Sequence, residues 1–377
     1  MKIVRIEIFH IAIPFAVPYK LSKAYGTLTH AHAVIFKVHT DEGIVGLGEA
    51  NPMNPFTEET PASVMVVTRD LIAPHLLGHD PTKIAALEST LDQAVYGNLT
   101  ARGAINMSLY DIFGKANNLP VHAFLGGMRQ NKLPLLNGVG SGSPEEDSAA
   151  IEKWMEQGYR SFMIKMGSLP IDMEIQRMIS AKEHFGGEIT IIVDANQGWE
   201  LLETLRFIDG IKNYPPDLIE QPIKRWDIEG LKRIHERSPC ALSADESLCT
   251  VQDAAILIRE QAVDAFSIKV SKNGGLDKSR HIAQMAEGFG LKCLMNSMLE
   301  FGITQAASLQ LGCTLPHLLD LGHAYMSVQR MSDDVTDFAK NISRAVVTVP
   351  SGSGLGVSID EDKLKRYSVD YLNIKAD

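Results

Sequence analysis

Five short apolar runs in the middle of this 377-residue chain each end on a charged side chain. The runs are Ser161–Lys165, Ile189–Asp194, Asp217–Glu220, Ala241–Asp245 and Asp264–Lys269. Their last residues follow one another at intervals of 24 to 29 positions, and one strand, one helix and two connections take roughly 25 to 30 residues. Equivalent strand ends of a closed parallel barrel meet around one mouth. The spacing therefore predicts two lysines and three carboxylates at the mouth of a barrel.

Strand–helix alternation continues on both sides of this stretch. Residues 134–139 are predicted to form a first strand, residues 292–296 a seventh and residues 317–322 an eighth. We therefore predict an α/β fold in which residues 126–345 form a modified (β/α)8 TIM barrel, with the last unit altered. This barrel would be the catalytic domain.

Residues 1–125 have a different pattern, with strands first and helices after them, and this predicts an α+β capping domain. Strands are expected over 1–14 and 32–50, with a hairpin turn at 41–43. The segments 15–29 and 50–57, which contain proline, are predicted to be loops. Helical periodicity follows in residues 63–77, 81–94 and 101–116. The C-terminal segment 346–377 includes a glycine-rich stretch and is predicted to return to the capping domain.

Composition excludes several classes of function. The formal net charge is −10 at pH 7, so no basic surface for nucleic acid or for anionic membranes is expected. The four cysteines are scattered without a paired motif, which is typical of reduced thiols in a cytoplasmic protein. No uninterrupted apolar run is long enough to span a membrane.

The three carboxylates predict a metal site. Asp194, Glu220 and Asp245 would form a hard oxygen-donor set, which suits Mg²⁺ and also permits Mn²⁺. Glu246 could replace its neighbour Asp245, but adjacent strand residues face opposite sides, so we assign Asp245 to the metal and Glu246 to a supporting role. Taken singly, each acid is more often a helix cap or a surface residue than a metal ligand; the even spacing of the three supports the metal site.

Lys165 and Lys269 end strands that are separated by three intervening units, and they are expected to face each other across the mouth. A lysine beside a divalent cation can be held neutral, because nearby positive charge lowers its pKa. A neutral lysine is a plausible general base for a carbon acid. The alternative is that both lysines only form salt bridges with the carboxylates.

These segments together resemble the enolase superfamily, in its muconate-lactonizing-enzyme subgroup. The segments that carry the resemblance are Ile164–Gly167, Val193–Gln197, Ile219–Pro222, Ala244–Ser247 and Ile268–Gly275, with Ala104–Gly127 upstream. The resemblance implies Mg²⁺-assisted abstraction of a proton α to a carboxylate, through an enediolate intermediate. It assigns Asp194, Glu220 and Asp245 to the metal, and Lys165 and Lys269 to acid–base catalysis. It also implies a homo-oligomer, either a dimer or an octamer.

Two positions depart from the family pattern. Met163 stands where the family usually has the first lysine of Lys-x-Lys, whose charge helps to lower the pKa of the second lysine. Either a higher pH optimum or a compensating cation would follow. Asp320 is the only acid of the eighth-strand segment, where dipeptide epimerases of the subgroup often carry Asp-x-Asp for the substrate ammonium group.

Further residues are assigned supporting or substrate-contacting roles. Asn196 and Asn296 follow predicted strands, and Met298 and Glu300 belong to a Met-Leu-Glu stretch of the family type. Glu300 could hydrogen-bond near the reacting centre or be a surface or capping acid. The segments 15–29 and 50–57 would cover the mouth and offer aromatic and apolar side chains, with only two lysines. These are Phe15, Tyr19, Tyr25, Met53 and Phe56, with Lys20 and Lys23.

The main functional prediction is a racemase or epimerase of N-acyl amino acids or dipeptides, acting on a small-molecule carboxylate. The alternative on the same scaffold is a muconate-type cycloisomerase, or a dehydratase like o-succinylbenzoate synthase. A cycloisomerase would need cations for a second carboxylate, and the covering segments supply few. An alternative of another class is a non-catalytic barrel that binds an acidic metabolite.

Overall fold

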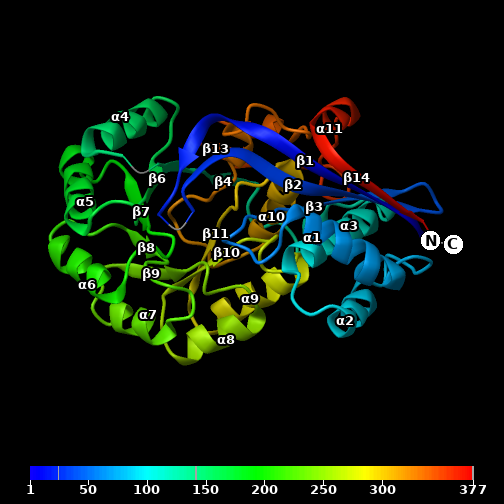
Figure 1. Ribbon diagram of the computed structural model, residues 1–377, viewed down its shortest axis with the longest axis horizontal. Helices are drawn as coiled ribbons and strands as arrows, with labels where there is room; N and C mark the ends of the chain where they lie inside the picture. Colours follow the sequence, from blue (N-terminus) through cyan, green and yellow to red (C-terminus); the bar gives the residue numbers. More distant parts are fainter. Residues whose placement is uncertain (24, 141, 376–377) are drawn as a thin grey trace.

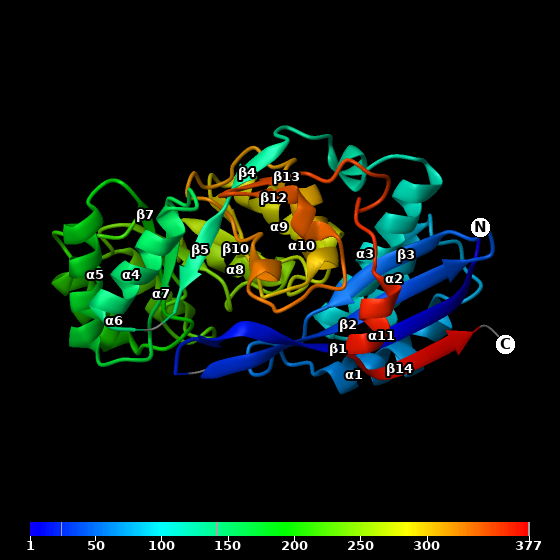
Figure 2. The same ribbon diagram turned by 90° about the horizontal axis from the view of Figure 1, so that it is seen from above.

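The computed structural model describes residues 1–23, 25–140 and 142–375. It consists of a parallel barrel ringed by helices and a smaller unit of antiparallel strands and helices beside it (Figure 1). A long hairpin of the smaller unit runs along one end of the barrel, as both views show (Figure 2). The α/β fold class predicted from the sequence is confirmed.

The capping domain contains one four-stranded antiparallel sheet in the order β14-β1-β2-β3, with helices on one side. Its N-terminal elements are β1 (Ile3–Lys20), β2 (Thr27–Thr40), β3 (Val45–Ala50), α1 (Pro61–Val67), α2 (Ile84–Ala94) and α3 (Leu99–Ala116). The predicted loop 15–29 is wrong for most of its length. Strand pairing resumes at Tyr19 opposite Leu28 after an irregularity, so that β1 and β2 form one extended hairpin.

Helix α3 packs closely on β3 because two glycines of the strand leave room for it. A Cβ atom on Gly48 would lie 2.0 Å from the carbonyl oxygen of Ala104, and one on Gly46 would lie 2.3 Å from that of Ser108. The N-terminus of α3 is capped from a distance, since the Glu59 carboxylate accepts hydrogen bonds from the backbone N–H groups of Thr100 and Ala101. A carboxylate suits this position, because it meets the positive end of the helix dipole.

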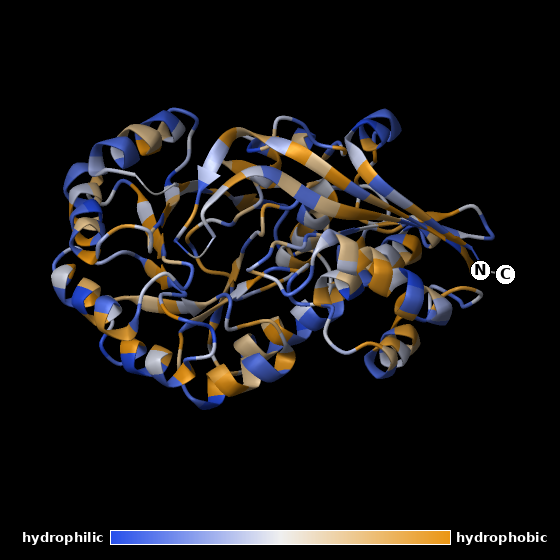
Figure 3. Cartoon of the chain, in the orientation of Figure 1, coloured by the Kyte–Doolittle hydropathy of each residue, from blue (hydrophilic) through white to orange (hydrophobic). Residues whose placement is uncertain are grey.

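The barrel has seven parallel strands in sequential order, each followed by a helix. The strands are β5 (Leu136–Val139), β6 (Ser161–Lys165), β7 (Thr190–Asp194), β8 (Leu218–Glu220), β9 (Ala241–Ala244), β10 (Ala265–Ile268) and β11 (Lys292–Met295). The helices are α4 (Pro144–Met155), α5 (Ile171–Phe185), α6 (Leu201–Gly210), α7 (Ile228–His235), α8 (Val251–Arg259), α9 (Leu276–Gly288) and α10 (Gly302–Gly312). These helices alternate hydrophilic and hydrophobic stretches along their length (Figure 3).

The predicted eighth strand over residues 317–322 does not form. This segment makes one parallel bridge to β11, between Leu318 and Cys293, and one to residue 135, from His323. Gly322 has a positive φ of 78°, and a chain in that conformation cannot continue a regular ladder. The segment therefore closes the barrel through isolated bridges, in agreement with the prediction of an altered last unit.

The chain after the barrel returns to the capping domain. Three short strands form a separate antiparallel sheet: β4 (Lys132–Pro134), β12 (Ile342–Ser343) and β13 (Val346–Thr348). They are followed by α11 (Glu361–Tyr367) and β14 (Ser368–Lys375). Strand β14 pairs antiparallel with β1, with Lys375 opposite Arg5, so that the last described strand lies beside the first one (Figure 1).

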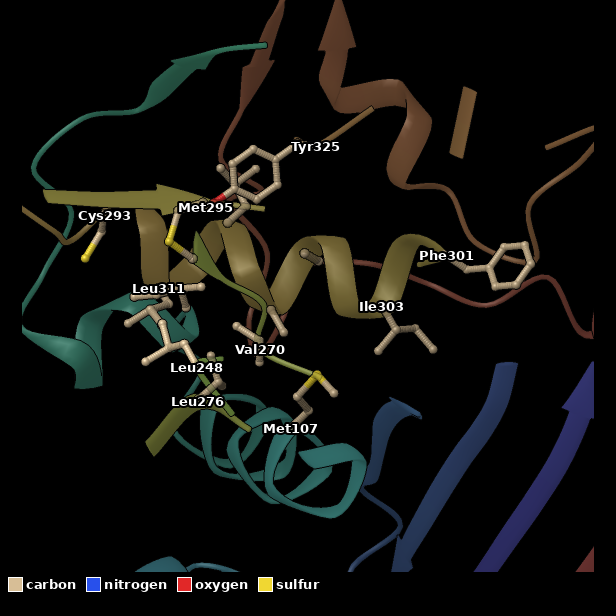
Figure 4. Packing of buried hydrophobic residues seen from close by; sticks show 14 of the residues in the cluster. Met107, Leu248, Val270, Leu276, Cys293, Met295, Phe301, Ile303, Leu311 and Tyr325 are labelled. Atoms are coloured by element: carbon tan, nitrogen blue, oxygen red, sulfur yellow. The ribbon is translucent and has the colours of Figure 1, made fainter. Parts of the chain in front are cut away.

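Polar and apolar contacts both tie the barrel to the capping domain. Glu49, at the end of β3, accepts hydrogen bonds from the backbone N–H groups of Phe301 and Thr304 at the start of α10. Buried apolar side chains of α10, β11 and α3 gather in the same region, and Figure 4 shows Ile303, Met295 and Met107 among them. No helix within the described residues is long and apolar enough to cross a membrane.

Candidate active site

The candidate site is built by the alternation of side chains along the barrel strands. A cluster of apolar side chains fills the barrel interior: Leu136, Met163, Ile192, Leu218, Ala265, Leu294 and Ala324. Residues two positions apart on a strand face the same side. The next inward-facing residues are therefore Gly138, Lys165, Asp194, Glu220, Ser267 and Asn296, which form the polar floor of the mouth.

The strand register places three of these side chains at one level. Lys165 is paired with Asp194 across β6 and β7, and Asp194 is paired with Glu220 across β7 and β8. Neighbouring strands lie about 4.8 Å apart, so these side chains are immediate neighbours. Asp245 and Lys269 are the next inward-facing residues beyond the ends of β9 and β10. They therefore lie closer to the opening of the mouth than the residues of the polar floor.

Both predicted lysines contact a predicted metal ligand. The Nζ atom of Lys165 donates to Oδ2 of Asp194, and Nζ of Lys269 donates to Oδ2 of Asp245 at 2.6 Å. The salt bridges that formed the alternative interpretation of the sequence are thus present. They also bring acids and lysines into a single site, as the catalytic interpretation requires.

The Glu220 carboxylate lies at the centre of the acidic set. Its Oε1 accepts from Nδ2 of Asn296 at 2.8 Å, and its Oε2 accepts from Oγ of Ser267 at 3.2 Å. Burial raises the pKa of Glu220 well above its ordinary value, and the negative charges of Asp194 and Asp245 raise it further. A bound cation would relieve this repulsion.

Lys165 is held in place by a buried ion-pair network behind β6. Arg177 donates to the backbone carbonyl of Lys165 at 3.0 Å and pairs with the carboxylates of Asp147 and Glu174. Glu174 also accepts hydrogen bonds from the N–H groups of residues 167–169. The loop after β6 is therefore fixed, and Gly167 (φ 80°) has no room for a side chain, since a Cβ would lie 2.5 Å from the Ala195 carbonyl oxygen.

Asp245 is positioned by two residues that the sequence did not single out. Oε1 of Gln221 accepts from the backbone N–H of Asp245 at 3.0 Å, which fixes the turn after β9. Nζ of Lys272 donates to Oδ1 of Asp245 at 2.8 Å, opposite Lys269. Burial raises the pKa of Asp245, but the two ammonium groups outweigh it, and the net shift is downward.

The turn of the long hairpin closes over the mouth. The hydroxyl of Tyr25 donates to Oε1 of Glu246 at 2.9 Å and accepts from Nε2 of Gln197 at 2.8 Å. Asn196 also donates to the same Glu246 oxygen, at 3.4 Å. Burial, with the charges of Asp245 and Asp194, raises the pKa of Glu246 to about 8. Tyr25 thereby links the capping domain to the strand ends of the barrel.

Tyr25→Phe tests this link. The substitution removes the hydroxyl but keeps the ring, whose centroid lies 5.7 Å from that of Phe56. We expect KM for substrate to rise by about three- to tenfold, since one hydrogen bond contributes about 1 kcal/mol, while the unfolding temperature stays within a few degrees. Steady-state kinetics and thermal unfolding measure both quantities. An unchanged KM would show that Tyr25 does not hold the covering segment closed.

One pocket lies between the hairpin and the barrel mouth. Six of the residues that line it were predicted site residues: Lys165, Lys269, Asn196, Asn296, Met298 and Tyr25. Most of its other walls are apolar, from Leu21, Met53, Phe56, Leu136, Met163, Leu299 and Met326. The Nζ atom of Lys269 lies 4.2 Å from the ring centroid of Phe56. Met163 reaches the pocket floor on the same face of β6 as Lys165.

Three other residues proposed from the sequence lie elsewhere. Asp320 is exposed and outside the pocket lining, because Leu319 and Leu321 on either side of it pack into the barrel interior. Glu300 is 1% exposed and does not line the pocket; it accepts hydrogen bonds from Ser297 and Gln305. Phe15 is a buried residue of β1 and forms an isolated antiparallel bridge with Met331.

Comparison with known proteins gives the same picture for the chain as a whole. The family described as Enolase C-terminal domain-like matches residues 146–363, and the Mandelate racemase / muconate lactonizing enzyme, N-terminal domain family matches residues 3–126. The chain belongs to the enolase superfamily, in its muconate-lactonizing-enzyme subgroup. The family resemblance stated from the sequence is therefore confirmed.

Curated relatives of this enolase-superfamily protein are isomerases of three kinds. An N-succinyl-L-Arg/Lys racemase from Bacillus cereus is 30% identical over 98% of this chain and 98% of its own. A chloromuconate cycloisomerase from Cupriavidus necator is 30% identical over 98% and 99%, and an L-Ala-D/L-Glu epimerase from Bacillus subtilis is 31% identical over 95% and 97%. The crystal structure of the Bacillus cereus racemase superposes with a TM-score of 0.95, at 27% identity, and each chain is covered completely. The protein is an isomerase of this superfamily.

The acidic residues of this superfamily member fit a hard divalent cation by their chemistry. Asp194, Glu220 and Asp245 are buried carboxylates at neighbouring strand ends. Two more oxygens nearby, Oδ1 of Asn196 and Oε2 of Glu246, are buried without a hydrogen-bond partner. Within the described part of the chain, no three His, Cys, Asp or Glu side chains are gathered in a geometry that would hold a metal ion as they stand. Lysines occupy oxygens of two of the carboxylates, Asp194 and Asp245.

Three residues of the site were not predicted from the sequence: Gln221, Lys272 and Arg330. Gln221 and Lys272 lie inside the family segments, but their roles depend on turns that spacing does not define. Arg330 lines the pocket from a segment with no regular structure beyond the 3-10 turn 327–329. In the sequence it appears only as a single positively charged residue after the predicted eighth strand, with no motif around it.

Proposed function

We propose that this protein is a Mg²⁺-dependent racemase or epimerase that removes and returns the α-proton of an N-acyl amino acid or a dipeptide. The carrying observation is the placement of Lys165 and Lys269 in one pocket. Lys165 ends β6 and Lys269 follows β10, and these strands are four positions apart in a barrel of seven described strands and one closing segment. Two such lysines stand on opposite sides of a bound substrate, so that each serves one face of the α-carbon.

The chain's own residues divide the work. One lysine takes the α-proton while its partner, in the ammonium form, returns a proton to the opposite face. Asp194, Glu220 and Asp245 would hold Mg²⁺. When bound, this ion would place positive charge against the substrate carboxylate and stabilise the enediolate. The hairpin turn and Phe56 exclude water from the reacting carbon.

A lysine that acts as a base must lose its proton. Burial lowers the pKa of Lys165, but the carboxylates of Asp194 and Glu220 outweigh burial, and the net shift is upward. The pKa of Lys269 is likewise lowered by burial and raised on balance by Asp245, Glu220 and Glu246. A cation bound by these acids would offset their negative charge and so lower the pKa of both lysines.

The relatives support this proposal, since a racemase and an epimerase match nearly the full chain. The muconate-type cycloisomerase remains the second candidate. Relatives with that activity match equally well, and Arg330 places a cation in the pocket that could bind a second carboxylate.

Proton exchange in D₂O tests the proposal. The protein with Mg²⁺ is incubated with pooled N-acyl amino acids and dipeptides, and α-deuterium is read by mass spectrometry together with chirality. Incorporation with inversion supports the racemase. An absence of exchange across the pool, with turnover of cis,cis-muconates, would assign the protein to the cycloisomerases. A protein that neither exchanges protons nor binds Mg²⁺ by calorimetry would be a binding barrel.

Met163→Lys tests how this chain manages without the first lysine of the family motif. Its side chain would lie on the same face of β6 as Lys165, and an added positive charge lowers the pKa of a neighbouring ammonium group. We expect the acidic limb of the kcat–pH profile to move to lower pH by roughly one unit. The variant is also expected to unfold at lower temperature, because the lysine would enter the apolar interior. An unmoved limb in a folded variant would argue against the missing charge as a determinant of the profile.

A further inference from the structure

Arg330 is the one cation lining the pocket that has no carboxylate partner within the described chain. Lys165 pairs with Asp194 and Lys269 pairs with Asp245. Arg330 also lines the pocket, and it is half-buried, but no described Asp or Glu lies within ion-pair distance of it. A guanidinium among apolar walls is stabilised when an anion joins it.

The guanidinium of Arg330 is held rigidly by one edge. Nη2 donates to Oδ1 of Asn137 at 2.7 Å and to the carbonyl oxygen of Gly138 at 2.5 Å. The flat face stacks on Tyr19, with the guanidinium carbon 4.3 Å from the ring centroid. Within the described residues, Nε and Nη1 make no hydrogen bond, so donors remain for a ligand.

The backbone of β5 is shaped to admit this arrangement. A Cβ atom on Gly138 would lie 2.5 Å from the Tyr19 hydroxyl oxygen and 3.1 Å from Nη2 of Arg330. Only glycine leaves space for both side chains at this position. Tyr19 comes from the capping domain, so the guanidinium is fixed by both parts of the fold.

The place of Arg330 relative to the acids indicates which part of a substrate it would meet. Arg330 contacts β5, whereas Asp194 and Glu220 end β7 and β8, on the other side of the Lys165 strand. A substrate whose α-carboxylate lies toward the acids would extend past Lys165 to the guanidinium. The group that reaches Arg330 is therefore distal to the reacting carbon.

We propose that Arg330 binds a second carboxylate of the substrate, so that this protein acts on dicarboxylates such as amino acids with a dicarboxylic acyl group. The inference rests on the proposed function and names the substrate class of the same site. A guanidinium with an exposed edge pairs with a carboxylate through parallel N–H···O bonds, which a lysine cannot form. The second carboxylate could belong to the acyl group or to the amino-acid side chain.

Matched ligand pairs distinguish these two sources. The first pair is N-succinyl-L-leucine and N-succinamoyl-L-leucine, which have the same shape and differ in the charge of the distal group. The second pair is N-acetyl-L-glutamate and N-acetyl-L-glutamine. With wild-type protein and Mg²⁺, we expect kcat/KM for the charged member of one pair to exceed that of its amide by on the order of 30-fold. The pair that shows the preference identifies the source.

Arg330→Gln should abolish this preference, because kcat/KM for the charged ligand should fall toward the value for its amide. Arg330→Lys should show only part of the preference for the charged ligand. Lysine keeps the positive charge but lacks the planar guanidinium with its parallel N–H donors. Lys20→Gln is the matched control. Lys20 follows Tyr19 in β1, and its side chain is an exposed cation outside the pocket lining. This variant should retain the full preference.

The outcomes separate this inference from the proposed function. A wild-type protein that exchanges the α-proton of charged and amide ligands equally would overturn the role of Arg330 while the racemase proposal stands. Equal losses on both ligands in Arg330→Gln would also overturn it, because they would indicate a purely structural contact with β5. If no ligand is turned over, calorimetric binding of the same pairs to wild-type protein decides the question. Preferential binding of the charged member then supports Arg330, even though the racemase proposal fails.

Discussion

Lys165→Ala is expected to abolish racemisation while Lys269 continues to exchange the α-proton of one enantiomer. Under the proposed mechanism each lysine serves one face of the α-carbon, so the variant that lacks one lysine still has a base for the opposite face. Loss of a positioned acid–base group costs about 10²- to 10⁴-fold in rate, and racemisation needs both groups. Lys269→Ala should give the mirror result, with exchange retained for the other enantiomer. Deuterium incorporation measured separately on each pure enantiomer checks both variants.

A control variant shows whether removing a lysine outside the pocket also lowers the rate of exchange. Lys182→Ala removes a lysine of α5 that is ion-paired with Asp217 and lies outside the pocket lining. It should retain wild-type rates of exchange for both enantiomers. If Lys165→Ala and Lys269→Ala instead removed exchange from the same enantiomer, a single lysine would be the base. The second lysine would then serve mainly to stabilise charge, as in cycloisomerases and dehydratases of the subgroup.

The acids and lysines of the site could be placed from the sequence because strand ends have a regular geometry. A parallel barrel repeats one unit, so the interval between charged strand ends predicts which side chains meet. The prediction required only that each strand be found, and Lys165, Asp194 and Glu220 are the last residues of β6, β7 and β8. Assigning chemistry to them came from the resemblance to a family, not from the spacing.

The parts that were missed depend on tertiary contacts. Pro18 and Gly26 suggested a loop over 15–29, but the pairing of Tyr19 and Lys20 with β2 continues the hairpin past the proline. Asp320 was proposed from the family pattern at the eighth strand, whose register the sequence does not define. Arg330 was overlooked because it lies outside every periodic segment. Its importance follows from the Tyr19 ring and the β5 carbonyl, which are 311 and 192 residues away in the sequence.

Asp245→Asn is expected to weaken Mg²⁺ binding by more than about 100-fold, whereas Glu246→Gln should weaken it by about tenfold or less. Residues that only support a ligand typically cost 10- to 100-fold in metal affinity when they are changed, so a direct ligand should cost more. The prediction rests on the position of Asp245 one step beyond β9, where, in addition to burial, its negative charge and that of Asp194 raise the pKa of Glu220. Glu246 instead faces Tyr25 and Asn196 beneath the hairpin. Calorimetric titration of Mg²⁺ into each variant measures the ranking.

The stability of Asp245→Asn without Mg²⁺ provides an independent readout of the same carboxylate. Lys269 and Lys272 lower the pKa of Asp245 below its ordinary value of 3.8, against the effect of burial. A carboxyl group whose pKa is lowered on folding stabilises the protein above its unfolded-state pKa, and this contribution is lost as the pH falls through the folded-state pKa. The variant should therefore unfold more easily than wild type at neutral pH, and the difference in stability between the two proteins should narrow below a pH of about 3.8.

A larger loss of Mg²⁺ affinity in Glu246→Gln than in Asp245→Asn would contradict the ranking. The third metal ligand would then be Glu246, since its Oε2 is buried without a partner. Asp245 would then be left as the counter-ion of the two lysines.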